Sequence, residues 1–214
     1  MATRAVIFDF NGTLSDDKPV LCRIYCELFA EHGRPISPQH YYDELAGHSE
    51  EAIAHACLGT GDPRGPACGA ERIARYRAAV GDGSTVPESV REAVRYAGER
   101  VPLAIVSGAA REEIEPVVAA AGLAGLLATI VPADDVVDGK PHPEGYLRAL
   151  GLLGTGIRAE EVLVFEDTEA GVASAKAAGM RCLAVLGTLP PERLAAADEL
   201  VERIDVPLMR RLLG

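Results

Sequence analysis

Short apolar runs that alternate with helical patterns constrain the fold more than any other feature of this sequence. The runs have the length of buried strands, and the segments between them carry the apolar spacing, prolines and glycines of helices. Such alternation is typical of a parallel sheet with crossover helices. We therefore expect an α/β fold built on a Rossmann-like, doubly wound parallel sheet. The expected strands are 5–9, 102–107, 129–132, 162–166, 182–186 and 199–201, and the expected core helices are 87–100, 111–122, 143–151 and 169–179.

One early segment departs from this alternation. Between the first strand and residue 84 the sequence shows only helical patterns, at 19–33, 38–46, 49–58 and 70–80, with a loop rich in glycine and proline at 59–69. We predict a Rossmann-like catalytic core formed by residues 1–15 and 84–214 and an inserted helical cap domain formed by residues 16–83. Gly, Ser and Asp at both crossings are typical of hinges, which favours a mobile lid; ordinary loops in a rigid domain are the alternative.

The composition excludes several classes of partner. The 214-residue chain is 48% apolar, enough for a full hydrophobic core, and its formal net charge is −11. Nucleic acids and anionic membrane surfaces require clustered Lys and Arg, so we expect neither as a partner. No apolar stretch of about 18 residues is present and the chain begins in a strand, so we expect no membrane span, no signal peptide and a cytoplasmic location. Nothing in the sequence indicates an oligomeric state.

A single carboxylate ends the first expected strand. Asp9 precedes a turn that contains Gly12, at the sheet edge where open α/β folds bind ligands. A carboxylate in this position is a candidate nucleophile toward phosphorus, and Phe10, Gly12 and Thr13 are candidate contacts for a phosphoryl oxygen. Asn11 stands two residues after the nucleophile, where a second carboxylate would deliver a proton to the leaving group. An amide cannot shuttle a proton.

Three further features fall at strand or loop ends on the same side of the expected sheet. Ser107 and Gly108 offer a hydroxyl and a backbone N–H to a phosphoryl oxygen, and Lys140 offers an ammonium group to a carboxylate and a phosphoryl group drawn together. Glu166 and Asp167 offer hard oxygen ligands suited to Mg²⁺. Taken singly, Lys140 also fits a solvated loop lysine, and the two acids also fit caps of the following helix. The expected metal ligands are Asp9, the backbone carbonyl of Asn11, Glu166 and Asp167.

With these residues in order, the chain resembles the haloacid dehalogenase superfamily, in its branch of small phosphatases and β-phosphoglucomutases with a helical cap. The resemblance covers nearly the whole chain, and its four motifs correspond to 9–13, Ser107, Lys140 and 166–167. It implies an aspartyl-phosphate at Asp9, with Ser107 and Lys140 holding the phosphoryl group and its charge. It also implies Mg²⁺ on Asp9, the Asn11 carbonyl and Asp167, with Glu166 as an inner or outer partner of the metal.

The expected partner is a small phosphorylated molecule that enters beneath the cap. His48 and Ser49 are candidate contacts for a substrate hydroxyl, although Ser49 equally fits a helix N-cap. The β-phosphoglucomutases carry an arginine for a second phosphate where this chain has Glu50, which counts against a sugar phosphomutase.

The sequence thus predicts a Mg²⁺-dependent phosphatase that hydrolyses a small organic phosphomonoester through an aspartyl-phosphate. Two alternatives stay open at this point. One is a phosphotransferase or phosphomutase. The other is a phosphate-ligand-binding protein whose turnover is impaired because Asn11 replaces the general acid.

Overall fold

The computed structural model describes residues 2–46 and 50–214. In this part of the chain, six parallel strands form a sheet in the order β3-β2-β1-β4-β5-β6. The chain builds outward from β1 in one direction and then, from β4 on, in the other, so the predicted doubly wound Rossmann-like α/β fold is confirmed. The strands are β1 (Ala5–Phe8), β2 (Leu103–Val106), β3 (Leu127–Val131), β4 (Val162–Glu166), β5 (Arg181–Val185) and β6 (Glu199–Val201).

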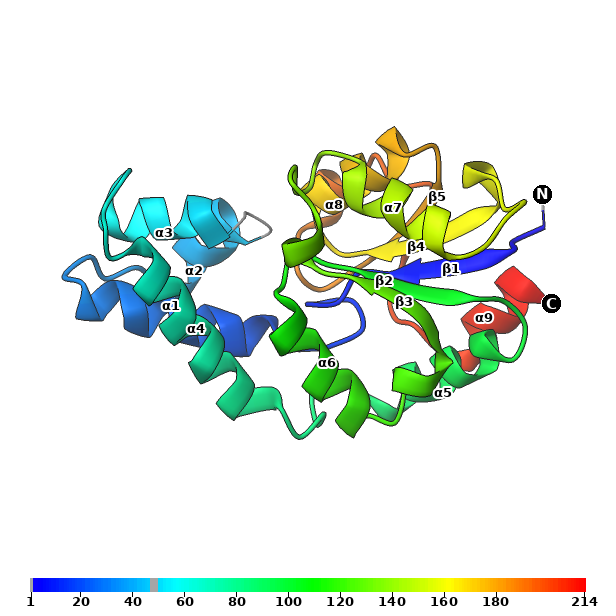
Figure 1. Ribbon diagram of the computed structural model, residues 1–214, viewed down its shortest axis with the longest axis horizontal. Coiled ribbons are helices and arrows are strands. Elements are labelled where there is room, and N and C mark those ends of the chain that lie inside the picture. Colours follow the sequence, from blue (N-terminus) through cyan, green and yellow to red (C-terminus); the bar gives the residue numbers. More distant parts are fainter. Residues whose placement is uncertain (1, 47–49) are drawn as a thin grey trace.

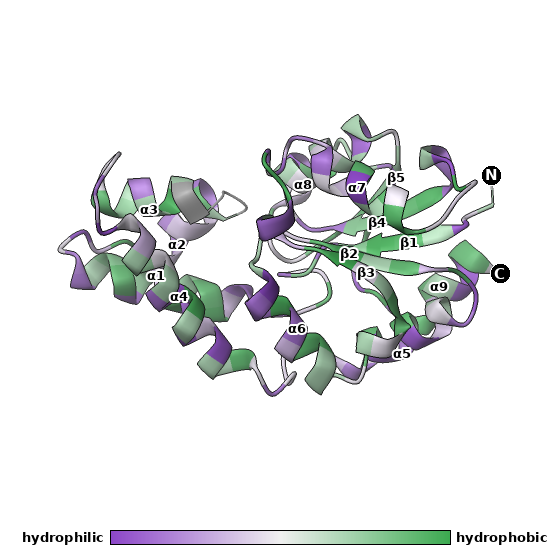
Figure 2. Ribbon diagram, viewed as in Figure 1, coloured by the Kyte–Doolittle hydropathy of each residue, from purple (hydrophilic) through white to green (hydrophobic). Residues whose placement is uncertain are grey.

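Helices cover both faces of this sheet (Figure 1). One face carries α7 (Glu144–Leu152) and α8 (Glu169–Ala177); the other carries α5 (Glu88–Gly98), α6 (Arg111–Ala120) and α9 (Val206–Leu213). Because both faces are covered, the central strands are apolar along their length, as Figure 2 shows for β1, β2 and β4. Side chains alternate between the two cores, so Val6 and Phe8 pack on one face, and Ala5 and Ile7 on the other.

The segment between β1 and α5 forms a separate group of helices beside the sheet (Figure 1). Most of this group was predicted, but the loop expected at 59–69 is wrong for its last five positions, which are helical. Pro66 stands in the first turn of that helix, where its fixed backbone angle suits a helix start, and only the turn with positive φ at Gly59 and Gly61 stays a loop. The group comprises α1 (Lys18–Glu31), α2 (Pro38–His40), a π-helical turn (Tyr41–Leu45), α3 (Glu50–Leu58) and α4 (Gly65–Val80).

The helix α9 was missed by the sequence analysis, although its start carries a recognisable signal. The side chain of Asp205 accepts a hydrogen bond from the N–H of Leu208 at 2.9 Å, and Pro207 stands in the first turn. An acidic N-cap followed by proline is a typical helix start. No helix in the described part of the chain is both long enough and apolar enough to cross a membrane.

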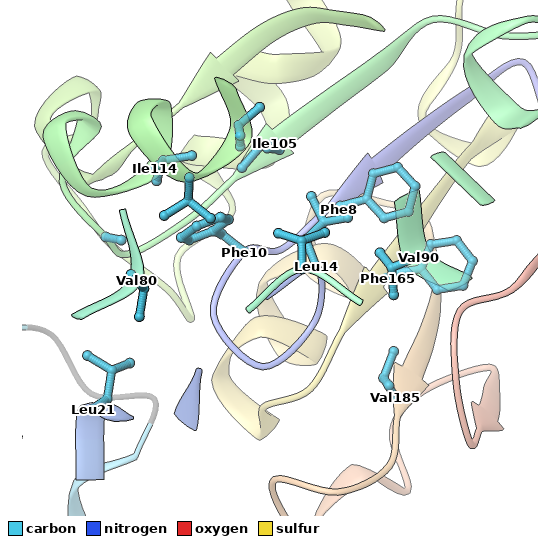
Figure 3. Packing of buried hydrophobic residues seen from close by; sticks show 14 of the residues in the cluster. Phe8, Phe10, Leu14, Leu21, Val80, Val90, Ile105, Ile114, Phe165 and Val185 are labelled. Atoms are coloured by element: carbon cyan, nitrogen blue, oxygen red, sulfur yellow. The ribbon is translucent and has the colours of Figure 1, made fainter. Parts of the chain in front are cut away.

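The helical group between β1 and α5 is joined to the helices that cover the sheet by a hydrophobic cluster and a buried ion pair. Figure 3 shows Phe10 and Leu14 from the turn after β1 in the cluster that also contains Leu21 of α1 and Val80 of α4. Beside this cluster, Arg72 of α4 donates two hydrogen bonds to Glu113 of α6. Their side chains are only 4% and 0% exposed, so a charged contact joins the helical group to the sheet-covering helices away from water.

Replacing Glu113 by glutamine should lower the free energy of unfolding by about 3 to 5 kcal/mol, because the buried guanidinium of Arg72 would lose its counter-charge. Arg77 and Glu112 provide a matched control on the same two helices, since their ion pair spans 2.7 Å but both side chains are about half exposed. Glu112→Gln should cost less than about 1 kcal/mol. Urea unfolding measures both losses, and equal losses would contradict a special role for the buried pair.

Candidate active site

The site lies at the point where the strand order reverses, between β1 and β4. These strands pair in parallel with Phe8 opposite Phe165, and the two rings stack with their centroids 5.4 Å apart (Figure 3). The stacked pair favours this register because both rings are fully buried. Asp9 and Glu166 therefore reach the carboxyl edge of the sheet on neighbouring strands, at the crevice where doubly wound sheets bind ligands.

Lys140 connects these two carboxylates. Its Nζ lies 2.6 Å from Asp9 Oδ1 and 2.5 Å from Glu166 Oε1, and it also donates to the carbonyl oxygen of Val106 at 3.2 Å. Burial by itself would lower the pKa of Lys140, but the two carboxylates outweigh this effect and raise the pKa. The ammonium group therefore stays charged.

Burial raises the pKa of Asp9 to about 7, although Lys140 opposes the shift. Its side chain is only 9% exposed, and Glu166 and Asp167 add further negative charge nearby. A nucleophilic carboxylate must be ionised, so Asp9 needs more positive charge beside it than Lys140 supplies if it is to be fully ionised near neutral pH.

Both carboxylate oxygens of Glu166 accept hydrogen bonds from other groups of the protein. Its Oε1 accepts from Lys140 and, at 2.7 Å, from the hydroxyl of Tyr146. Its Oε2 accepts from the N–H of Asp167 at 3.1 Å and from the hydroxyl of Thr168 at 3.2 Å. Burial would raise the pKa of Glu166, but Lys140 and these donors lower it. Glu166 is thus an ionised group that holds Lys140 in place.

Asp167 is the buried acid that directly follows β4. Its Oδ2 accepts from Thr188 at 2.5 Å and lies 3.3 Å from Lys18 Nζ, while its Oδ1 has a long contact of 3.5 Å with the hydroxyl of Thr13. Oxygen atoms of Asp9, Glu166 and Asp167 all lie within 4.8 Å of one another. Clustered carboxylate oxygens are the donors that Mg²⁺ prefers, so this donor set fits a magnesium ion.

The side chain of Asn11 is held by a buried acid and a buried tyrosine. Its Nδ2 donates to Asp17 Oδ2 at 2.9 Å and to the hydroxyl of Tyr76 at 3.1 Å, and Tyr76 donates to Asp17 at 2.5 Å. Burial raises the pKa of Asp17 to about 6. Both amide hydrogens of Asn11 are engaged by these contacts. The polar atom that it has left for a ligand is an acceptor oxygen, which cannot protonate a leaving group.

A cavity of about 330 Å³ opens between the sheet edge and the helical group. Ser107 and Gly108 line it directly after β2, together with Asp9, Asn11 and Lys140. The Oγ of Ser107 accepts from the N–H of Ala109 at 3.1 Å, so the hydroxyl hydrogen is available to an oxygen in the cavity. The opposite wall is largely apolar and aromatic; its residues include Leu21, Tyr25, Tyr41, Ile53, Arg72 and Ile73.

Phe10, Gly12 and Thr13, which were also predicted as substrate contacts, are not among the described residues that line the cavity, and two further predicted contacts lie outside the described residues. The ring of Phe10 is buried in the hydrophobic cluster (Figure 3), and the N–H of Gly12 already donates to the carbonyl of Ser15 at 2.7 Å. Thr13 is turned toward Asp167. These three residues shape the turn that presents Asp9 and Asn11. His48 and Ser49 lie outside the described residues.

Sequence reasoning did not assign a site role to five side chains that the structure brings to this region. Asp17 and Lys18 follow the first motif closely, so their position along the chain was a usable signal. Tyr76 and Tyr146 lie within helices at core-facing positions, and Thr188 follows β5, where no motif marks it. Their contacts depend on pairings between distant segments, which a single sequence does not display.

Comparison with known proteins identifies the family. The model of haloacid dehalogenase-like hydrolases matches residues 3–179, which include all four motifs. The chain belongs to this family. The resemblance inferred from the motifs is thereby confirmed, and this haloacid dehalogenase-like hydrolase is an enzyme.

Its relatives group it with the phosphatases of the family. It is 32% identical to validoxylamine A 7'-phosphate phosphatase of Streptomyces hygroscopicus subsp. limoneus, over 93% of each chain. It is 27% identical to phosphoglycolate phosphatase of Yersinia pseudotuberculosis serotype I, over 85% of this chain and 80% of the relative. A solved structure of a CbbY variant from Rhodobacter sphaeroides, in complex with xylulose-(1,5)bisphosphate, superposes with a TM-score of 0.83 at 25% identity, covering 94% of this hydrolase and 95% of that chain.

Gly171 of α8 should be essential to the position of Glu166. A Cβ at residue 171 would lie 1.9 to 2.0 Å from the carboxylate atoms of Glu166, which Lys140, Tyr146 and Thr168 prevent from moving freely. Gly171→Ala should therefore reduce hydrolase activity at least about tenfold and destabilise the fold by about 1 to 3 kcal/mol.

Gly151 of α7 is the matched control, because a Cβ there meets nothing within 4 Å. Gly151→Ala should leave activity unchanged and gain up to about 1 kcal/mol of stability from helix propensity. Phosphate release and urea unfolding measure the two variants. Full activity in Gly171→Ala would contradict the positioning role of Glu166.

Proposed function

We propose that this chain is a Mg²⁺-dependent phosphatase that hydrolyses a small organic phosphomonoester through an aspartyl-phosphate on Asp9. The observation that carries the proposal is the buried contact between Asp9 and Lys140 at the edge of a ligand-sized cavity. The two named phosphatases among its relatives support it, since each is named for a small phosphorylated molecule.

In the proposed reaction, a carboxylate oxygen of Asp9 attacks phosphorus and the ester P–O bond breaks, so the leaving group departs as an oxyanion that takes its proton from solvent. Water then hydrolyses the acyl phosphate and restores Asp9. Lys140 offsets negative charge where the carboxylate and the phosphoryl group approach each other, and Glu166 keeps its ammonium group there. The hydroxyl of Ser107 and the N–H of Gly108, both on the cavity wall, hold phosphoryl oxygens.

We further propose that Asp9, the backbone carbonyl of Asn11 and Asp167 hold Mg²⁺. Bound there, the ion would neutralise charge on the phosphoryl oxygens and favour the ionised form of Asp9. The family resemblance allows Glu166 either to contact the metal directly or to lie in its outer shell. We assign it to the outer shell, because both of its oxygens already accept hydrogen bonds. The raised pKa of Asp9 supports a need for such a cation.

We also propose that residues 16–83 act as a cap that selects the substrate. The cavity wall contributed by this segment is rich in apolar and aromatic side chains. Each lysine or arginine among the described lining residues is already paired with a carboxylate: Lys18 with Asp167, Arg72 with Glu113 and Lys140 with Asp9. This wall therefore favours a substrate whose leaving group is uncharged over one with a second phosphate or a carboxylate.

Asp9→Asn should reduce phosphate release at least about 1,000-fold, because the variant lacks the nucleophile. The assay uses the purified protein with Mg²⁺ and a panel of sugar, aryl, glycolyl and nucleoside monophosphates. Asp16→Asn is the control, since it makes the same chemical change at an exposed residue close in sequence. Chelation of the metal should abolish wild-type release as well. Undiminished release by Asp9→Asn would overturn the covalent mechanism.

Moving the carboxyl group from residue 17 to residue 11 should raise the hydrolysis of alkyl phosphates more than that of aryl phosphates. The swap variant Asn11→Asp with Asp17→Asn keeps one acid and one amide in hydrogen-bond contact, but puts the acid on the cavity side. General acid catalysis typically contributes about 10² to 10⁴-fold, and aryl leaving groups need it less. The expected gain in kcat/KM for an alkyl phosphate is at least about tenfold.

Asn11→Asp alone tests whether the neighbouring acid matters. That variant would place a half-buried carboxyl group in contact with the buried one of Asp17, where the two share a proton, so its gain should be smaller than that of the swap. The ratio of kcat/KM for an alkyl and an aryl phosphate is compared in all three proteins. A ratio that does not change in the swap would show that proton delivery does not depend on residue 11.

A further inference from the structure

A second ammonium group lies within the acidic cluster of the site. Lys18 Nζ is 3.3 Å from Asp167 Oδ2, and the two side chains are only 11% and 0% exposed. The stem of Lys18 runs beside Gly12, where an added Cβ would lie 2.4 Å from Lys18 Cε and 2.1 Å from Asp167 Oδ2. The glycine turn therefore leaves a space that the lysine and the aspartate fill together.

The helix that Lys18 begins does not explain this position. Lys18 is the first residue of α1, and positive charge at a helix N-terminus is unfavourable because the helix dipole is positive there. Its N-cap residue, Asp17, makes no side-chain capping bond and contacts Asn11 and Tyr76 instead. Burial also disfavours the ammonium, yet the surrounding acids, Asp167 first, raise the pKa of Lys18. The contact with Asp167 is the interaction that offsets these costs.

We propose that Lys18 is an internal counter-ion of Asp167 that competes with Mg²⁺ for this carboxylate. The proposal rests on the metal site of the proposed function, of which Asp167 is one ligand. The cluster holds three carboxylates, those of Asp9, Glu166 and Asp167. Among the described residues, Lys140 and Lys18 form ion pairs with them, so removing Lys18 would leave the ammonium group of Lys140 to balance their charge. Lys18 therefore reduces the uncompensated negative charge to which a metal ion is attracted.

The competition follows from the geometry. An ammonium group and a divalent cation that share one buried carboxylate repel each other, and little water separates them. Lys18 lines the cavity, so its ammonium group can move toward open space when the metal binds, but it then loses its partner. Metal binding is thus opposed by the free energy that is lost when the ion pair between Lys18 and Asp167 is weakened. This chain should consequently bind Mg²⁺ more weakly than the same site without Lys18.

The test measures Mg²⁺ binding rather than turnover. Isothermal titration gives the Kd for Mg²⁺ in the full-length wild type and in Lys18→Met, which removes the charge but keeps an unbranched stem. The expected Kd of Lys18→Met is at least about tenfold lower. Lys18→Arg should remain within about threefold of the wild type because it keeps the positive charge. Lys176→Met, at an exposed surface pair with Asp198, should match the wild type.

Thermal unfolding with and without Mg²⁺ supplies a second readout. Lys18→Met should melt at a lower temperature than the wild type without metal, since Asp167 loses its counter-charge, and Mg²⁺ should raise its Tm by more. If Lys18→Met does not fold without metal, Lys18→Gln replaces it, because the amide removes the charge and still donates to Asp167. An unchanged or higher Kd in the folded neutral variant would overturn the proposal.

The two proposals fail differently. Absence of phosphate release, combined with tighter Mg²⁺ binding in Lys18→Met, would refute the phosphatase mechanism and support the role of Lys18. Phosphate release that depends on Asp9 and Mg²⁺, combined with equal Mg²⁺ affinities in all variants, would do the reverse. Absence of Mg²⁺ binding in both the wild type and Lys18→Met would refute the metal site and the role of Lys18 together.

Discussion

The contact of one buried lysine with two carboxylates is the interaction on which the candidate site depends. Lys140 comes from the loop before α7, Asp9 from the end of β1 and Glu166 from the end of β4. Each of these charges would be costly to bury alone, so the three groups make one another possible. Tyr146 and Thr168 complete the shell around Glu166, so Asp9 and Lys140 are the two members of the trio that line the cavity.

The turn after β1 and the residues that follow it bring charged groups of both signs to the site. The position that would bear a proton-donating acid holds the amide of Asn11, and a buried acid, Asp17, stands behind it. That acid is oriented by Tyr76 from α4, a helix far along the chain from the turn. The next residue, Lys18, brings positive charge to Asp167. At residue 11 the cavity therefore has an amide in place of a carboxylate, and at residue 18 a lysine balances the charge of Asp167. Both residues lie within ten positions of Asp9.

The helical group is joined to the core by apolar packing and by two buried ion pairs, between Arg72 and Glu113 and between Lys18 and Asp167. Leu21 and Val80 belong to the cluster that also contains Phe10, so the hydrophobic core continues from the sheet into α1 and α4. Arg72 lines the cavity but is bound to Glu113, which leaves Tyr25 and Tyr41 as the larger features of that wall. The contacts that attach the helical group to the core thus also determine which side chains line the cavity beside Asp9.

The sequence by itself determined the doubly wound sheet, because fully buried parallel strands require continuous apolar runs, and these can be read locally. It also predicted that Asp9, Ser107, Glu166 and Asp167 lie at one edge, since the carboxyl ends of parallel strands share an edge, and that Lys140 reaches this edge from a loop. Local signals at Pro66 and Asp205 were present but were outweighed by glycine content and short length, so the start of α4 and all of α9 were missed.

Only the tertiary structure decided what each polar group contacts. It showed that both oxygens of Glu166 are occupied, that the amide of Asn11 is bound to Asp17 and Tyr76, and that Lys18 reaches Asp167. The physical reason is that hydrogen bonds and ion pairs are directional and short, so they depend on the packing of segments such as α4, α7 and the loop after β5. Apolar patterning fixes which face of a segment is buried, but it does not fix which polar atoms then meet.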